Sequence, residues 1–396
     1  MNSAPARLLY SAGGLWSLWT LMACRAAGWD IAPISAAQVA AGGLNGARAL
    51  VAPGGWPALK AAALGPAGRQ AVHEFVTAGG AYLGLCGGAG LALTGGDGLG
   101  LVDLGRTSGK KRLPSLSGPV LTRPGDDAAR HPLWRDLAPP LPLHVWWPGQ
   151  FAAPLPAGLR VVAAYAGPAP GLCTADLEVD QVAVDQWPAL EKAYGLRLDP
   201  AGLAGLPAMV EAGLGRGRVL LSYLHLDTPG DASGRRALAN LWQVWLGLEP
   251  MPAPPAEAAP GGWPAAPELA SAADAVWQQG QDLGLWRPRH PAMPLWRRGA
   301  RGLEFWSLRE LCRALAAHPV HPGQDLASEL AALLDAIRRD APVVLAWQAR
   351  ALAGETAGPP PAASAWFPAP RRTGGDLARI LERLELAIFT QEAARR

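Results

Sequence analysis

The chain has 396 residues and half of them are apolar, so it can bury the cores of two or three domains. Its 35 basic and 32 acidic residues give a net charge of +3 without a basic block, which excludes the charge pattern of a nucleic-acid-binding protein. Its four cysteines are widely spaced and form no CxxC pair, which argues against a disulfide framework and a zinc site.

The first ninety residues alternate short apolar strands with helices. Strands are predicted over 7–11, 30–34, 48–52 and 81–85, with helices over 16–27 and 68–78. This alternation favours a parallel sheet with helices on both faces. Gly13-Gly14, Gly54-Gly55 and Cys86 each follow a strand, and the carboxyl ends of parallel strands share one edge of a sheet. We therefore expect the three turns to line one crevice.

The middle of the chain is less regular. Possible strands lie over 120–121, 141–147, 158–165 and 174–184, between turns rich in Pro and Gly. They predict an antiparallel extension of the main sheet. Regularity returns with a strand over 219–224, which ends in His225 and Asp227, and with a closing helix over 234–246. The α/β domain is therefore expected to span 1–249.

A linker and a second domain are predicted beyond this point. Residues 250–267 are nearly all Pro, Ala and Gly, with too few large apolar residues to pack. Helices are then expected over 268–283, 303–317, 326–345 and 375–394. We expect 268–396 to form an all-α domain of unknown role, which could hold a protein partner or mediate self-association.

A cytoplasmic location is the default for a chain with so few, scattered cysteines. The alternative is a lipoprotein signal, because an apolar run over 15–24 ends in Leu-Met-Ala-Cys24. Met22 and Arg25 fit such a box poorly, and cleavage would remove the first predicted strand. No segment reaches the roughly 20 apolar residues needed to span a bilayer. No membrane contact, metal or cofactor is expected.

The segment Ala81-Tyr-Leu-Gly-Leu-Cys86-Gly-Gly-Ala-Gly has the pattern of a nucleophile elbow with sulfur as the nucleophile. A nucleophile at the tip of a strained turn needs neighbours without side chains, so that the backbone can pass closely. The helix that starts next would favour the thiolate through its dipole. The alternative interpretation is a buried structural cysteine in a glycine-rich loop.

A catalytic cysteine needs a base, and the base needs a carboxylate to orient it. Of seven histidines, His225 lies at the end of a predicted strand on the same sheet edge as Cys86. Asp227, two residues on, would lie on the same side of an extended chain and could hold the imidazole. His144, in a possible strand beside two tryptophans, is a weaker candidate. A structural role for His225 is the alternative.

These features together resemble the class I glutamine amidotransferase-like superfamily. The resemblance rests on the Pro53-Gly54-Gly55 turn, on Gly79-Gly80-Ala-Tyr-Leu-Gly-Leu-Cys86, and on Gly215-Arg-Gly-Arg-Val-Leu-Leu followed by His225-x-Asp227. Within the superfamily the chain is most similar to the domain at the amino end of eukaryotic biotin–protein ligases, which also occurs alone in bacteria. The likeness covers about residues 6–248.

The resemblance implies a flavodoxin-like fold and a Cys-His-acid triad. Carried over by residue, Cys86 is the nucleophile, His225 the base and Asp227 the residue that orients it. The amide of Gly87 and an amide of the Gly54-Gly55 turn would form the oxyanion hole. Gly13, Gly14, Trp56 and Trp147 are expected to line the substrate crevice.

The chain departs from the superfamily pattern in two places. Residues 100–210 form a long insertion, so Cys86 and His225 are farther apart in sequence than in the compact amidotransferases. The chain also has His225-Leu226-Asp227 where the superfamily usually has His-Pro-Glu, so the carboxylate is one methylene shorter. The sequence predicts an amidohydrolase or amidotransferase-like protein that cleaves a small amide or acyl substrate through a thioester. Two alternatives remain open: a catalytically idle module that binds a small ligand or regulates a partner, and a glyoxalase-like relative of the cysteine hydrolases.

Overall fold

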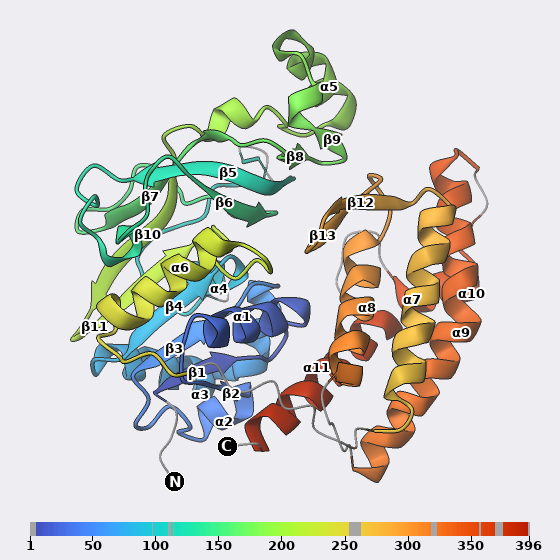
Figure 1. Ribbon diagram of the computed structural model, residues 1–396, viewed down its shortest axis with the longest axis horizontal. Coiled ribbons are helices and arrows are strands. Elements are labelled where there is room, and N and C mark those ends of the chain that lie inside the picture. The colour runs from blue at the N-terminus through green and yellow to red at the C-terminus, as the bar shows by residue number, and fades with distance from the viewer. Residues whose placement is uncertain are drawn as a thin grey trace. The chain divides into compact units, whose positions relative to one another are not determined.

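The chain folds into two compact units, Met1–Ala253 and Pro254–Arg396 (Figure 1). The computed structural model describes residues 5–96, 98–109, 112–113, 115–252, 263–317, 323–355, 358–368 and 375–394. Pro250 and Met251 of the predicted linker lie against Gly28 of the first unit, and the amide of Met251 donates to the Gly28 carbonyl at 2.8 Å. Most of the remaining linker lies outside the described residues.

Five parallel strands form one half of the sheet in the first unit. They are β1 (Ala6–Leu9), β2 (Ile31–Ile34), β3 (Ala49–Ala52), β4 (Ala81–Leu85) and β11 (Gly217–Ser222). Their order is β2-β1-β3-β4-β11, and each neighbouring pair runs in parallel. This is the strand order of flavodoxin-like doubly wound sheets. The predicted α/β fold is confirmed.

The other half of the sheet is the predicted antiparallel extension. Beyond β11 the order continues through β10 (Pro207–Leu214), β7 (Arg160–Pro168), β5 (Leu116–Pro124), β8 (Cys173–Thr174) and β9 (Leu177–Glu178), while β6 (Leu141–Trp146) pairs with β5. Sequence analysis missed β10, and it expected a long strand over 174–184. That stretch instead holds two short strands and two 3-10 turns, Val179–Gln181 and Val184–Gln186, followed by helix α5 (Trp187–Tyr194).

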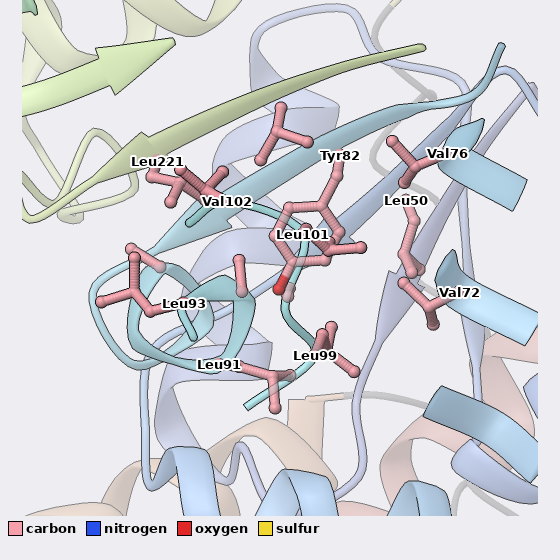
Figure 2. Packing of buried hydrophobic residues seen from close by; sticks show 14 of the residues in the cluster. Leu50, Val72, Val76, Tyr82, Leu91, Leu93, Leu99, Leu101, Val102 and Leu221 are labelled. Atoms are coloured by element: carbon pink, nitrogen blue, oxygen red, sulfur yellow. The ribbon is translucent and has the colours of Figure 1, made fainter. Parts of the chain in front are cut away.

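Two groups of helices pack with the parallel half of the sheet. Helix α1 (Leu15–Ala26) contacts α6 (Ala232–Asn240), which continues as a π-helical turn, Leu241–Trp245. Helices α2 (Ala36–Ala40), α3 (Pro57–Thr77) and α4 (Gly87–Ala92) form the second group. The main core lies between this second group and alternate residues of the strands, including Leu50, Tyr82 and Leu221 (Figure 2). Further single 3-10 turns are Pro132–Trp134 and Pro200–Leu203.

The second unit is helical but not all-α, so that prediction was wrong in one respect. Its helices are α7 (Ala266–Asp282), α8 (Gly302–Ala317), α9 (Gln324–Leu352), α10 (Pro361–Trp366) and α11 (Asp376–Ala394). A hairpin of β12 (Trp286–His290) and β13 (Met293–Trp296) follows α7, with Trp286 paired opposite Trp296. Three prolines interrupt this segment, and a sequence with so many prolines argues against strands because proline cannot donate to a strand ladder. The paired tryptophans and their packing outweigh that signal.

Candidate active site

Cys86 occupies the tip of a strained turn between β4 and α4. Its φ of 46° lies in the left-handed region, which a residue with a Cβ seldom adopts. The two glycines that follow leave no room for a side chain: a Cβ on Gly87 would lie 1.9 Å from the Gly55 carbonyl oxygen, and one on Gly88 would lie 1.9 Å from the Ala52 oxygen. The Cys86 amide donates to the Ser222 carbonyl on β11 at 2.6 Å. The local geometry is therefore that of the predicted elbow.

The three predicted turns meet at this edge of the sheet. A Cβ on Gly55, whose φ is 99°, would lie 3.0 Å from the Ala12 oxygen and 3.5 Å from the Gly13 Cα. Gly55 therefore contacts both Gly87 and the turn after β1. Gly14 is the N-cap of α1, and the fully buried side chain of Lys60 lies beside Gly13. The three turns therefore meet at one edge of the sheet, as strand order predicted.

His225 and Asp227 form a fully buried pair that begins three residues beyond the end of β11. The Asp227 Oδ1 lies 2.9 Å from Nδ1 of His225, an ordinary hydrogen-bond length. Asp in place of Glu therefore still reaches the ring. The hydroxyl of Thr20 on α1 lies 2.5 Å from the other carboxylate oxygen, Oδ2. Asp227 is thus held from two sides.

The His225 ring lies against the glycine turn that also contacts the elbow. A Cβ on Gly54 would lie 3.1 Å from the His225 Cε1, and the ring centroid is 4.8 Å from that of Trp16. Its Nε2 atom is buried and makes no hydrogen bond to any described residue. Sequence analysis placed His225 on the same edge as Cys86, and the Gly54-Gly55 turn contacts both His225 and Gly87, the residue after Cys86.

The charges around His225 favour its protonated form. Burial alone would lower the pKa of the imidazole, but the negative charges of Asp227 and of a Cys86 thiolate outweigh burial and raise the pKa to about 10. The same carboxylate affects Cys24 on α1. Burial is the main cause that raises the pKa of the Cys24 thiol, and the negative charge of Asp227 raises that pKa further. The electrostatic centre of the site is therefore Asp227, with His225 between it and Cys86.

Tryptophans from the antiparallel extension and from α1 cover this pair. The Cys86 Sγ lies 3.8 Å from the Trp146 carbonyl oxygen, and the Trp146 indole donates to the Thr228 hydroxyl at 3.0 Å. Trp147, with a φ of 50°, lies 6.5 Å from Trp16 between ring centroids. Trp56, by contrast, is 56% exposed at the start of α3. Of the two tryptophans expected to line the crevice, only Trp147 contacts the aromatic group around His225.

His144, the weaker candidate for the base, belongs to a separate pair. Its Nδ1 lies 2.8 Å from the Asp231 Oδ2, while Asp231 also caps α6 by accepting from the Gly234 amide at 2.9 Å. The His144 ring stacks on Trp146 at 5.8 Å between centroids. These contacts give His144 a structural role beside the site. His144 contacts His225 through the backbone, because the His144 carbonyl accepts a hydrogen bond from the His225 amide at 2.8 Å.

Cys86 differs from the other three cysteines in its accessibility. Cys24, Cys173 and Cys312 are buried, and Cys86 is partly exposed. Cys24 lies inside α1, so cleavage there would remove β1 from its place between β2 and β3. Within the described ranges, no helix has the length and apolarity to cross a bilayer, and no three His, Cys, Asp or Glu side chains gather as metal ligands would.

Sequence analysis missed several residues at the site. Trp16 and Thr20 lie on α1, which begins directly after the Gly13-Gly14 turn. Their nearness in sequence to that predicted turn could have identified them as site residues.

Part of the chain matches a known family. Residues 16–94 match the family model described as biotin-protein ligase, N terminal. This confirms the resemblance over the segment that contains the elbow. The matched segment ends before His225 and Asp227, so it does not test the triad. A search of the curated proteins finds no match.

Solved structures give only distant likenesses. A protein from Thermoplasma acidophilum, described as a subunit of GMP synthase, is 14% identical, with a TM-score of 0.39 over 62% of this chain and 94% of that one. A ThuA-like protein from Bacteroides uniformis is 13% identical, with a TM-score of 0.38 over 62% and 93% of the two chains. A β-galactosidase from Rahnella sp. R3 is 13% identical, with a TM-score of 0.38 over 63% of this chain and 33% of that one.

Proposed function

We propose that the protein is a cysteine-dependent amidohydrolase that acts through Cys86, His225 and Asp227. The observation that carries the proposal is the buried His225–Asp227 pair, whose ring has a raised pKa and an Nε2 atom that makes no hydrogen bond to a described residue. A buried imidazole of this kind is a protonated acid at neutral pH, and Cys86, whose charge contributes to the raised pKa, is partly exposed. This favours a thiolate–imidazolium pair ready for acyl transfer.

The reaction would run in two halves. The Cys86 thiolate attacks the carbonyl carbon of the amide, and the negative charge moves to the carbonyl oxygen. As this intermediate collapses, the Nε2 proton of His225 goes to the departing nitrogen, which leaves as ammonia or an amine. A thioester remains on Cys86. Neutral His225 then takes a proton from water, hydroxide attacks the thioester, and the acid leaves with the thiolate and imidazolium restored.

Backbone amides of the glycine turns would stabilise the tetrahedral intermediate. Gly54, Gly55 and Gly87 are packed too closely for side chains, which leaves backbone as the lining beside the sulfur. Their fixed positions would need little reorganisation during the reaction. Trp147 and the Gly13-Gly14 turn would form walls of the crevice, with Trp56 at its exposed rim.

Ammonia release from a panel of primary carboxamides, including glutamine, tests this function. The full-length protein should release ammonia and carry a transient acyl adduct at Cys86, detected by intact mass after acid quenching. Cys86→Ala should do neither. Equal ammonia release by the wild type and Cys86→Ala would contradict the proposal.

A second candidate function is a binding module without turnover. It is favoured by one observation: the buried Nε2 atom of His225 makes no hydrogen bond to a described residue, which leaves it available to a bound ligand. In that case a carboxamide would raise the melting temperature of the protein, while no ammonia and no adduct would form.

A further inference from the structure

Four tryptophans beside the triad contact one another in a closed ring. Trp16 and Trp19 lie on α1, Trp146 ends β6 and Trp147 follows it. From Trp16 to Trp19, on to Trp146 and Trp147 and back to Trp16, successive ring centroids are 5.2, 6.2, 6.2 and 6.5 Å apart. The first three side chains are at most 8% exposed, whereas Trp147 is partly exposed. Three buried indoles therefore hold in place a fourth that reaches the surface.

The backbone of Trp147 adopts a conformation that its sequence disfavours. Its φ of 50° lies in the left-handed region, where a bulky residue is rare. The following Pro148 favours an extended conformation at this position instead. Strained residues persist only where their surroundings hold them, and they gather at catalytic and ligand-binding sites. The strain therefore indicates a functional role for the direction in which the Trp147 ring points.

Short contacts connect Trp147 to the triad. The carbonyl of the peptide bond between Trp146 and Trp147 lies 3.8 Å from the Cys86 Sγ. The Trp147 ring neighbours that of Trp16, and the Trp16 centroid lies 4.8 Å from the His225 centroid. The partly exposed indole is therefore one aromatic neighbour away from His225 and one peptide bond away from a contact of the sulfur.

This position determines which part of a substrate would meet the indole. In the reaction proposed above, His225 passes its proton to the departing nitrogen, so that nitrogen must approach the His225 ring. A group carried by the nitrogen then lies beside Trp16 and Trp147. Indole rings bind flat aromatic groups by offset stacking or edge-to-face contact. An indole already fixed by its neighbours loses little conformational freedom when a ligand covers it.

We propose that Trp147, supported by Trp16, binds a flat aromatic group on the amine that leaves. The preferred substrates would be amides whose nitrogen carries an aromatic ring, with the acyl carbon at Cys86. As the tetrahedral intermediate collapses, the carbon–nitrogen bond breaks, and the aromatic amine takes the Nε2 proton of His225 and departs. Primary carboxamides would react more slowly, because they leave the indole uncovered. This inference rests on the proposed function for its leaving group, but the aromatic surface can be tested without turnover.

The first test compares alkylation of Cys86 by iodoacetanilide and by iodoacetamide in the full-length protein, with peptide mass readout. Iodoacetanilide carries a phenyl ring on the amide nitrogen. The rate ratio of the two reagents should exceed that of glutathione by at least about tenfold. Trp147→Leu should bring the ratio to within about twofold of glutathione and change the iodoacetamide rate by less than about twofold. Trp147→Phe keeps an aromatic ring and should retain a ratio at least about fivefold above glutathione.

Phe75→Leu is the matched control for these variants. Phe75 is also a partly exposed aromatic residue of the first unit. Its ring lies against Gly80, which precedes β4, so it is at the opposite end of this strand from Cys86. The substitution should leave the ratio of the two alkylation rates unchanged.

The second test does not need a reactive sulfur. In Cys86→Ala, millimolar acetanilide should raise the melting temperature more than its isomer phenylacetamide, whose ring is on the acyl side. Adding Trp147→Leu should abolish the acetanilide effect. An equal or larger effect of phenylacetamide would overturn the assignment of the ring to the leaving amine.

The two tests separate this inference from the proposed function. An unreactive Cys86 together with an acetanilide effect that requires Trp147 would end the proposed function and keep the aromatic surface. A reactive Cys86 with the rate ratio of glutathione, or an acetanilide effect that survives Trp147→Leu, would overturn the aromatic surface.

Discussion

Gly87→Ala tests the close passage of the two turns on which the site is built. A Cβ at this position would lie 1.9 Å from the Gly55 oxygen, 2.7 Å from its carbonyl carbon and 3.0 Å from its nitrogen. Ordinary contact begins at 3.4 Å, so one turn must move by about 1.5 Å. Because all three atoms belong to the backbone, no side chain can rotate away. We expect a cost near the upper end of overpacking, about 3 kcal/mol of the free energy of unfolding.

Pulsed alkylation in a urea series measures the loss of unfolding free energy for the first structural unit separately from the second. The buried thiols of Cys24 and Cys173 report unfolding of the first unit, and that of Cys312 reports the second. Gly213→Ala is the matched control, since a Cβ on this exposed glycine meets its nearest atom at 4.0 Å. Its effect should stay within about 0.5 kcal/mol. If Gly87→Ala were as stable as this control, the turns would not pass as closely as described.

Three further predictions concern the buried polar groups. A pH titration of His225 by NMR should give a pKa near 10, and Asp227→Asn should lower that pKa. The stability that the imidazolium contributes is then fully present below pH 6.5 and declines as the pH rises through about 10. A His225 ring that is neutral at pH 7 would contradict this prediction. Tyr223→Phe should stabilise the ligand-free protein by about 1 kcal/mol, since it removes an unpaired hydroxyl; a loss of similar size in urea unfolding would show that the hydroxyl is bonded. Thr20→Val should destabilise the first unit by about 2 kcal/mol, because one oxygen of the buried Asp227 carboxylate loses its donor; unchanged urea midpoints for Cys24 labelling would contradict it.

Local signals in the sequence predicted the parallel half of the fold and the elbow. The glycines around Cys86 indicate a turn in which the backbone passes too closely for side chains. The predicted strand before His225 indicates that this residue lies at the edge of the sheet. The position of Trp146 over the sulfur could not be predicted, because it depends on how β6 pairs with β5 in a region of weak periodicity. The hairpin at Trp286–Trp296 was missed for a related reason, since its stability comes from tryptophan packing against α7 and α8.

The rate of Cys86 alkylation by iodoacetamide at pH 6 tests the central claim that His225 activates this sulfur. At this pH an ordinary thiol is almost fully protonated. Cys86 should react at least about tenfold faster than glutathione, and His225→Gln should remove that advantage. His144→Gln, which alters the other histidine–aspartate pair, should leave the rate within about twofold. A wild-type rate no greater than that of glutathione, unchanged by His225→Gln, would contradict the account.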